Sequence, residues 1–259
     1  MATKLLFASD IDGTLLVEGR PDPDSVGRFT EWHAANPQIT LAYVTGRSHA
    51  SALAVIEEAG LPRPDVLIGS VGTDMRWWRR GAWNVDEEWS TRLARALGGR
   101  DFAAADPVVL ATEGAEIQTP AEQSRFKRSY RTPHGTFDGA AIAAELSRRG
   151  LSVNVVASVD PFTGDGLLDL LPRDTDKGSA VEHLRARLRL DTTAVAFAGD
   201  SGNDLAALLR PWWSIVVGNA PDTVRGRFAR GLDRDRRTIV TEAHVLRGVL
   251  EALEAMGWL

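Results

Sequence analysis

Short apolar runs alternate with longer mixed stretches over the first 75 residues. The runs at residues 4–9, 39–45 and 65–72 are continuously apolar, which predicts strands buried on both faces. The stretches at residues 23–35 and 48–61 between them are typical of helices, and the second ends at a Gly-Leu pair. Buried strands that alternate with helices indicate a parallel sheet covered on both faces.

The same alternation returns near the C-terminus, after a stretch of different character. Late helices are predicted at residues 176–190, 203–210 and 242–256, and late strands at 194–199 and 214–218. The middle predicts helices at 85–97 and 137–151, a strand within 116–132, and antiparallel strands at 152–159 and 166–172. We therefore expect an α/β fold with a doubly wound, mostly parallel sheet from residues 1–74 and 173–259, and an inserted α+β domain at residues 75–172. One continuous domain with an irregular middle is the alternative.

Composition narrows the class of protein without naming a function. The chain has 259 residues, of which 44% are hydrophobic and 25% charged, as in ordinary globular proteins. A net charge of −5 gives no overall positive field, so we expect neither a nucleic acid nor a membrane as partner. The chain has no cysteine, and its first ten residues hold no signal-peptide apolar segment. The expectation is a cytoplasmic monomer.

Two carboxylates follow the first predicted strand. Asp10 and Asp12 stand one residue apart, and Gly13 lets the chain turn after them. Carboxylates this close repel each other unless a cation lies between them, and Mg²⁺ favours such oxygen ligands. One carboxylate could attack phosphorus while the other protonates the leaving oxygen. The alternative is a pair that caps the junction between strand and loop.

Two further motifs have the chemistry of a phosphate site. The second strand ends at Thr45-Gly46-Arg47, which brings together a hydroxyl, a backbone donor and a guanidinium. The alternative is a helix N-cap made by Thr45 or Ser48. Lys177 opens a predicted helix, an unfavourable place for a positive charge unless an anion lies there. A solvated surface lysine is the alternative.

The fourth motif is GDSGND at residues 199–204. Asp200 follows a buried strand, where a side-chain metal ligand would lie, because ligands of an open α/β sheet bind beyond the carboxyl ends of its strands. Asn203 and Asp204 begin a helix, and Asp204 could orient water around the metal. The alternative is an N-cap arrangement for that helix.

The order and spacing of these four motifs resemble those of the haloacid dehalogenase-like (HAD) phosphatase superfamily. The resemblance implies a Rossmann-like core with a cap domain, and phosphoryl transfer that depends on Mg²⁺. It makes Asp10 the nucleophile and Asp12 the general acid/base. The implied metal ligands are Asp10, Asp12 through its backbone carbonyl, and Asp200. The residues implied to hold the phosphoryl group are Thr45 and Lys177, supported by Gly46, Arg47, Asn203 and Asp204.

Residues 43–75 and 117–132 narrow the resemblance to the sucrose-phosphate phosphatases and the related mannosylfructose-phosphate phosphatases, and the likeness extends over nearly the whole chain. It implies hydrolysis of the phosphate monoester of a disaccharide or similar glycoside, in partnership with a glycosyltransferase. Alternatives are a phosphatase for a cyclitol, amino-sugar, trehalose or hexose phosphate, and a non-catalytic module that binds a sugar phosphate. The implied sugar contacts in the cap are Gln118, Gln123, Lys127 and Ser129.

The chain departs from the family's pattern in the cap hairpin at residues 158–169. The family has an acidic residue two positions before the one that matches Asp169, and this chain has Leu167 there. Asp160 or Asp165 could replace the missing contact. A cluster of four tryptophans either stacks on sugar or packs within the protein, and we favour packing. These residues are Trp77, Trp78, Trp83 and Trp89.

Overall fold

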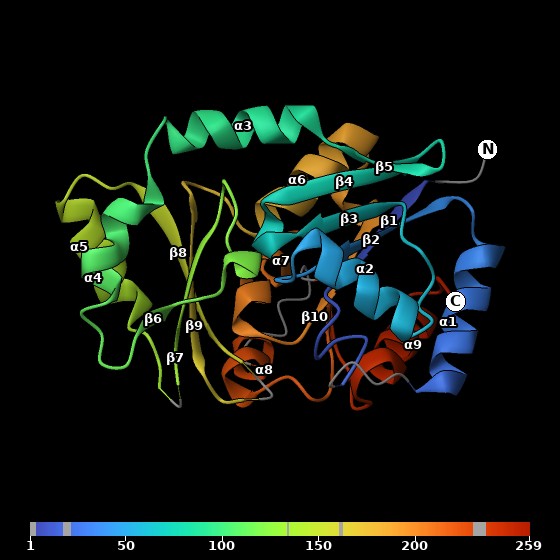
Figure 1. Ribbon diagram of the computed structural model, residues 1–259. Coiled ribbons are helices and arrows are strands. Elements are labelled where there is room, and N and C mark those ends of the chain that lie inside the picture. The colour runs from blue at the N-terminus through green and yellow to red at the C-terminus, as the bar shows by residue number, and fades with distance from the viewer. Residues whose placement is uncertain (1–3, 18–21, 134, 161–162, 230–236) are drawn as a thin grey trace.

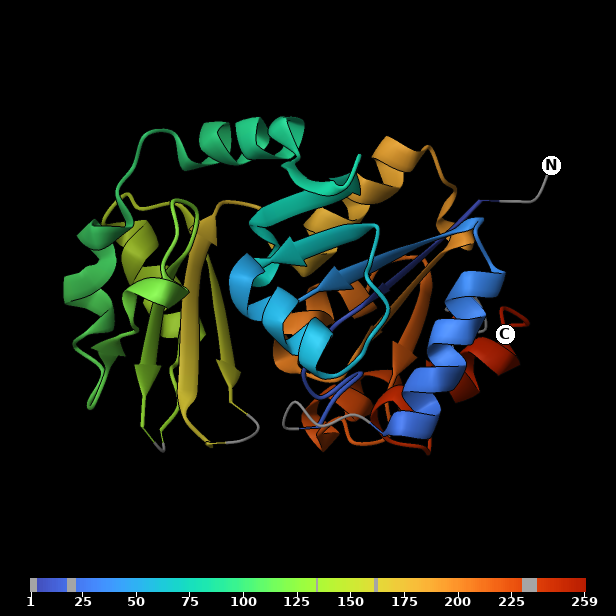
Figure 2. The same ribbon diagram turned by 45° about the vertical axis from the view of Figure 1, so that its right-hand side comes forward.

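The chain forms two sheets in the computed structural model (Figures 1 and 2). The residues it describes are 4–17, 22–133, 135–160, 163–229 and 237–259. The larger sheet has eight strands, which are, in spatial order, β12 (Thr238–Val240), β11 (Trp213–Val216), β10 (Val195–Gly199), β1 (Leu5–Ser9), β2 (Ile39–Val44), β3 (Val66–Gly69), β4 (Asp74–Arg79) and β5 (Ala82–Val85). The six strands from β12 to β3 run parallel, and β4 and β5 continue the sheet antiparallel. The expected α/β class with a mostly parallel sheet is confirmed.

Helices cover both faces of the large sheet. One face carries α1 (Pro23–Ala35), α2 (His49–Glu58) and α9 (Val245–Ala255). The other carries α3 (Glu87–Leu97), α6 (Lys177–Leu188), α7 (Leu205–Leu208) and α8 (Asp222–Ala229). Strand β1 shows the cause, since Phe7 packs into the first layer while Leu6 and Ala8 pack into the second. A strand buried on both faces needs the continuous apolar run that the sequence has.

The smaller sheet is antiparallel and has its own hydrophobic core beside the large one. Its strands are, in spatial order, β6 (Glu116–Ile117), β7 (Arg128–Thr132), β9 (Gly166–Pro172) and β8 (Val153–Val159). Helices α4 (Asp106–Val109) and α5 (Gly139–Arg148) pack on it, with Tyr130, Ile142 and Leu168 in the core between them. Figure 2 shows this unit next to the large sheet, with α3 passing above both. A second, antiparallel sheet is consistent with the predicted cap.

The hairpin of β4 and β5 lies outside the unit to which the sequence assigned it. The expected boundary after residue 74 falls inside β4, which pairs with β3 in the large sheet. Trp77 and Trp89 are buried in the core of that sheet, because the inward residues of β4 and α3 pack on one face of it. The pairing of β4 with β3 favours a later start for the cap, at Gly98, where α3 ends. The second expected boundary, after residue 172, coincides with the end of β9 at Pro172.

The tryptophan cluster packs within the protein. Trp77 and Trp89 are buried, and the guanidinium groups of Arg79 and Arg63 lie 4.3 and 4.2 Å from the ring centroids of Trp77 and Trp78. Trp78 and Trp83 make an edge contact with each other. The packing interpretation is confirmed. Among the described residues, no helix is long and apolar enough to cross a bilayer.

Candidate active site

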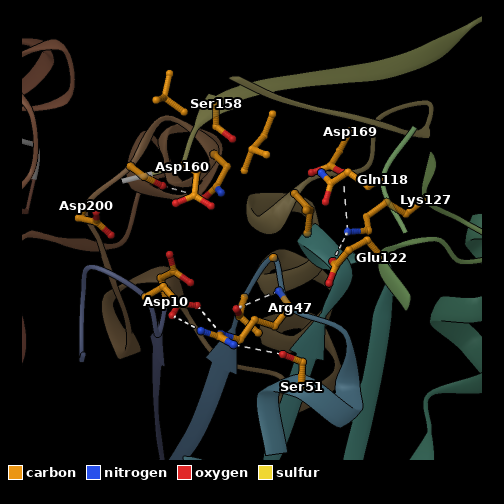
Figure 3. Close-up of a pocket in the computed structure, with 18 residues that line it drawn as sticks. Asp10, Arg47, Ser51, Gln118, Glu122, Lys127, Ser158, Asp160, Asp169 and Asp200 are labelled. Carbon is orange, nitrogen blue, oxygen red and sulfur yellow. Dashed lines mark hydrogen bonds and ion pairs between the residues drawn. The ribbon is translucent and has the colours of Figure 1, made fainter. Parts of the chain in front are cut away.

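A cavity lies between the carboxyl edge of the large sheet and the cap (Figure 3). Its lining from the large sheet includes Asp10, Asp12, Thr45, Arg47, Asp200 and Asn203. Its lining from the cap includes Gln118, Glu122, Lys127, Asp160, Leu167 and Asp169. Asp10 lies across the opening from Asp160 and Asp169, and two of the predicted sugar contacts, Gln118 and Lys127, line the same cavity as the predicted chemical residues named above.

Strand register brings the motifs of the large sheet together. Ser9 at the end of β1 lies beside Ala198 of β10, so Asp10 and Asp200 emerge at neighbouring strand ends. Strand β2 lies on the other side of β1, and Thr45 follows its last residue. Because the three strands are parallel, their carboxyl ends meet at one edge of the sheet.

Lys177 is completely buried under this edge, which excludes a solvated surface lysine. Its Nζ lies 3.0 Å from Asp10 Oδ2 and 2.8 Å from Asp204 Oδ1. Burial by itself would lower the pKa of Lys177, but Asp10 and Asp204 raise this pKa above its ordinary value. The lysine therefore stays protonated, and two carboxylates supply the anions that its place at the start of α6 requires.

Asp10, Asp200 and Asp204 form a buried carboxylate cluster, with one oxygen of each within 4.8 Å of the others. Burial, and then the charge of Asp204, raise the pKa of Asp10 well above its usual range and that of Asp200 to about 7. A divalent cation would relieve both effects, and Mg²⁺ takes carboxylate oxygens of this kind. The residues present therefore fit the expected metal.

Asp204 has a supporting role in this cluster. Its Oδ1 accepts a hydrogen bond from Lys177, and its Oδ2 accepts from the backbone N–H groups of Asp200 and Ser201 at 3.1 and 3.0 Å. Both of its oxygens are thus engaged by protein donors. Asp10 is engaged as well, by Ile11 N–H at 2.8 Å and by Lys177, so the choice of Asp10 and Asp200 as the side-chain metal ligands stays a prediction. Asn203 lines the cavity, and its Oδ1 accepts from Ser201 Oγ.

The turn after β1 packs directly against Asp200. Gly13 has a φ of 77°, and a Cβ at this position would lie 2.3 Å from Asp200 Oδ2, so the turn requires glycine. Thr14 Oγ1 donates to Asp200 Oδ1 at 2.8 Å, and the Asn219 side chain donates to the Gly13 carbonyl at 2.6 Å. No role was predicted for Thr14 or Asn219. Thr14 belongs to the first motif, but nothing around Asn219 marks it in the sequence.

The carboxylate of Asp12 is held by Arg47 and lies outside the carboxylate cluster. Arg47 Nε and Nη2 donate to the two oxygens of Asp12, each at 2.7 Å, and Arg47 Nη1 donates to Ser51 Oγ at 3.1 Å. The hydrogen bond to Asp12 raises the pKa of Arg47. Arg47 was predicted to support the phosphate, and its immediate partner is instead the predicted acid/base. Ser51, which the sequence analysis did not select, completes this contact.

The loop that carries Thr45 is supported by a strained segment. Ser70 and Val71 have φ values of 50° and 58°, which are costly for a β-branched residue such as valine. Their N–H groups donate to the carbonyls of Arg47 and Thr45, at 2.8 and 3.0 Å. Ser48 caps α2, so the N-cap alternative is correct for Ser48 and not for Thr45, which lines the cavity together with Gly46.

On the cap side, a buried lysine lies between two acids. Lys127 is 4% exposed, and its Nζ is 3.7 Å from Glu122 Oε2 and 3.7 Å from Asp169 Oδ1. Gln118 lines the same part of the cavity and donates to the Tyr130 carbonyl. This end of the cavity offers both donors and acceptors, as the hydroxyl groups of a sugar require.

Gln123 and Ser129 do not line the cavity, which differs from the prediction. The Gln123 amide donates to the carbonyls of Gln118 and Ser129, at 3.0 and 2.9 Å, and accepts from Ser129 N–H at 2.9 Å. Ser129 Oγ bonds to Asp169 and to the Glu122 carbonyl. Their polar groups are used within the protein, so these two residues position the side chains that face the cavity.

The cap hairpin also contributes to the lining of the cavity. Asp160 and Leu167 line the cavity, and Val159, which is 49% exposed, lies beside them. Asp165 does not line the cavity, so of the two acids considered Asp160 is the one in place. Positions 161 and 162 of the hairpin lie outside the described residues.

Comparison with known proteins identifies the family. The profile of the sucrose-6F-phosphate phosphohydrolases matches residues 3–257. The chain belongs to this family. The predicted family and enzyme class, a phosphoric monoester hydrolase of the HAD superfamily, are thereby confirmed.

Two relatives and one solved structure illustrate the family's range. A protein of Agrobacterium fabrum named mannosylfructose-phosphate phosphatase is 31% identical over 97% of this chain and 96% of its own length. A HAD-like hydrolase of Nitrosococcus oceani is 35% identical over 90% of this chain, which spans only 64% of that protein. The sucrose-phosphatase of Synechocystis sp. PCC6803, solved with sucrose and phosphate, has a TM-score of 0.84 and 24% identity, with 99% of each chain covered. This last likeness shows the fold.

Proposed function

We propose that this protein hydrolyses the phosphate monoester of a disaccharide or similar glycoside through an aspartyl phosphate on Asp10. The observation that carries the proposal is that Asp10 lies at the floor of the cavity, 3.0 Å from the buried ammonium of Lys177, with a polar cap surface opposite. A sensor that only binds sugar phosphate has no use for a carboxylate in this position. The names of the Agrobacterium and Synechocystis proteins support a sugar phosphate as substrate.

The chemistry divides between the two aspartates of the first motif. An oxygen of Asp10 attacks phosphorus, and Asp12 gives a proton to the sugar oxygen as its bond to phosphorus breaks. Asp12 then takes a proton from the water that attacks the aspartyl phosphate, which releases inorganic phosphate and frees Asp10. Arg47 fixes the position of the Asp12 carboxylate through two hydrogen bonds. Thr45 and Lys177 donate to the phosphoryl oxygens, where negative charge develops.

Asp10 and Asp200, with the backbone carbonyl of Asp12, are the groups that would hold Mg²⁺. When bound, Mg²⁺ supplies positive charge next to the phosphoryl oxygens and neutralises part of the carboxylate cluster. Asp204, with Lys177, keeps the cluster in place. The cytoplasmic location, the monomeric state and the functional partnership with a glycosyltransferase that we expect from the sequence remain predictions.

Release of inorganic phosphate from a panel of esters, with Mg²⁺ present, tests the proposal. The panel contains sucrose 6-phosphate, mannosylfructose phosphate, trehalose 6-phosphate, glucose 6-phosphate and p-nitrophenyl phosphate. We expect a disaccharide phosphate to have the highest kcat/KM, because the polar residues of the cap reach beyond the phosphoryl group. A higher value for glucose 6-phosphate would instead support a phosphatase for a smaller ester. No turnover of any ester would refute catalysis.

A further inference from the structure

A second cavity lies behind the loop that carries Lys127. It is formed where the end of α3 leads into the cap and meets loop 122–128. Its lining includes Arg100, Asp101, Gln123, Ser124, Arg125 and Arg128. Lys127 lines both cavities, and none of these six residues lines the active site. Loop 122–128 therefore separates the active site from a cavity to which no role has been given.

The lining of this second cavity is strongly basic. Lys127 and Arg128 have carboxylate partners that lie outside the cavity. Arg100 and Arg125 make no ion pair among the residues that the structure describes. The single acid of the lining, Asp101, uses its Oδ1 to accept from Ala103 N–H at 2.9 Å. Two guanidinium groups thus remain without a carboxylate partner at one cavity.

Both of these arginines are held in place by contacts that do not neutralise them. Arg125 stands in a turn closed by the hydrogen bond from Ser124 N–H to the Lys127 carbonyl, and its guanidinium lies 4.9 Å from the ring centroid of Phe126. Phe126 is buried in the core of the large sheet, which anchors the turn. Arg100 Nη1 donates to the Leu97 carbonyl at 3.2 Å. Both side chains are exposed, and these contacts orient their guanidinium groups at the cavity without neutralising them.

We propose that this cavity is a binding site for inorganic phosphate, held between Arg100 and Arg125. Guanidinium groups suit tetrahedral oxyanions because they present several N–H donors in one plane. The side chains of Gln123 and Ser124 add neutral polar groups to the lining. The volume of the cavity, about 200 Å³, is below the roughly 300–1,000 Å³ of pockets for larger organic ligands and suits a single small anion.

Phosphate in this cavity would link the segment after α3 to the loop of the cap. Arg100 belongs to the segment after α3, and Arg125 belongs to loop 122–128. The same loop carries Glu122 and Lys127, which line the active site. Binding would therefore order the loop from behind. The site does not depend on the proposed catalytic function, because its residues are separate from Asp10 and from the carboxylate cluster.

Calorimetric titration with inorganic phosphate in the presence of EDTA tests the site. Without metal, the carboxylate cluster disfavours phosphate at Asp10, so the measured binding reports the second cavity. We expect one equivalent to bind, and the double variant Arg100→Gln, Arg125→Gln to bind at least about tenfold more weakly, because it loses two charge-assisted contacts. The control is Arg80→Gln, Arg189→Gln, two exposed arginines that also lack ion pairs among the described residues. It should bind like the wild type.

Hydrogen exchange of the wild-type protein gives a test that does not require a variant to fold. Phosphate should slow exchange in residues 122–128, relative to chloride at equal ionic strength. Protection confined to residues 45–47 and the start of α6 would assign the binding to the catalytic site and overturn the proposal. So would equal affinity in wild type and Arg100→Gln, Arg125→Gln, or no binding at phosphate concentrations on the order of 10 mM. An absence of phosphate binding is also the result expected if this surface binds an acidic protein segment instead.

Discussion

Replacement of Lys127 by alanine separates recognition of the sugar from the chemistry at Asp10. Lys127 is the only cation within 4.0 Å of both Glu122 and Asp169 among the described residues. Its removal leaves two acids without their ammonium partner in a partly enclosed cavity. It also removes the group that we propose as a donor to the sugar hydroxyl groups. The variant does not touch Asp10, Lys177 or Asp200.

The size of the effect follows from the exposure of the groups that remain. The Asp169 side chain is 13% exposed, so its lost contact is little screened, whereas that of Glu122 is 35% exposed and solvent compensates part of its loss. A buried group left without its partner costs about 1–3 kcal/mol. If the contact is made to bound sugar, kcat/KM falls by roughly ten- to a hundredfold.

The assay compares two substrates. The best ester of the panel should lose this factor, while p-nitrophenyl phosphate, which has no sugar, should be cleaved nearly as before. Arg131→Ala is the matched control, because Arg131 is a cation on β7, the strand that follows Lys127, but is 49% exposed and pairs with Glu116 and Asp165, which do not line the cavity. Circular dichroism checks that the cap is folded. Equal losses on both substrates, or no loss on either, would contradict the assignment of Lys127 to sugar recognition.

Three further predictions concern the core. Asp10→Asn should lower turnover by about three orders of magnitude or more without unfolding the protein, since an amide cannot attack phosphorus; activity within about tenfold of wild type would exclude Asp10 as the nucleophile. Activity should vanish with a chelator, return with Mg²⁺ and return poorly with Ca²⁺, which prefers longer bonds and more ligands; full activity in metal-free buffer would contradict the mechanism. Asp86→Ala should lower the free energy of unfolding in urea by about 2–4 kcal/mol, because it removes the cap of α3 and the acceptor of the buried Trp77 indole; an unchanged urea midpoint would refute this.

The pKa of Asp86 gives the last of these predictions a dependence on pH. Burial would raise this pKa, but the His183 imidazole, whose Nε2 lies 3.5 Å from Asp86 Oδ1, and hydrogen bonds from the Trp77 indole and the Trp89 backbone N–H lower it below its ordinary value. The stabilisation by Asp86 is therefore present above the unfolded-state pKa of about 4. It is lost as the pH falls toward the lower folded-state pKa. The difference in stability between wild type and Asp86→Ala should shrink in acid, and a constant difference would contradict the assignment.

Most of the central sheet could be predicted from the sequence because each of its strands is buried on both faces. A continuous apolar run such as that of β1 or β10 has few other uses in a globular protein. The strands at the two edges of the large sheet were harder to predict from the sequence. In β4, the inward residues Met75 and Trp77 alternate with the less buried Arg76 and Trp78, and this pattern does not say which sheet the strand joins. Strand β12 has only three residues, and α8 has no strong apolar face in the sequence, so neither was predicted.

The sequence by itself determined where the proposed catalytic residues of the large sheet lie. Asp10, Thr45 and Asp200 stand at strand ends, and parallel register brings such ends to one edge of a sheet whatever the rest of the fold does. The family resemblance added Lys177 to this set. These conclusions needed only local pattern, motif order and one general rule of sheet topology.

Tertiary structure decided the partners of these residues. The burial of Lys177 between Asp10 and Asp204, and the pairing of Arg47 with Asp12, join segments far apart in the chain, so no local pattern specifies them. The same holds in the cap. Gln123 has polar groups suited to binding sugar, but its amide donates hydrogen bonds to the backbone instead. Residue type limits what a side chain can bind, whereas the packing of distant segments decides whether its polar atoms face the cavity or other parts of the protein.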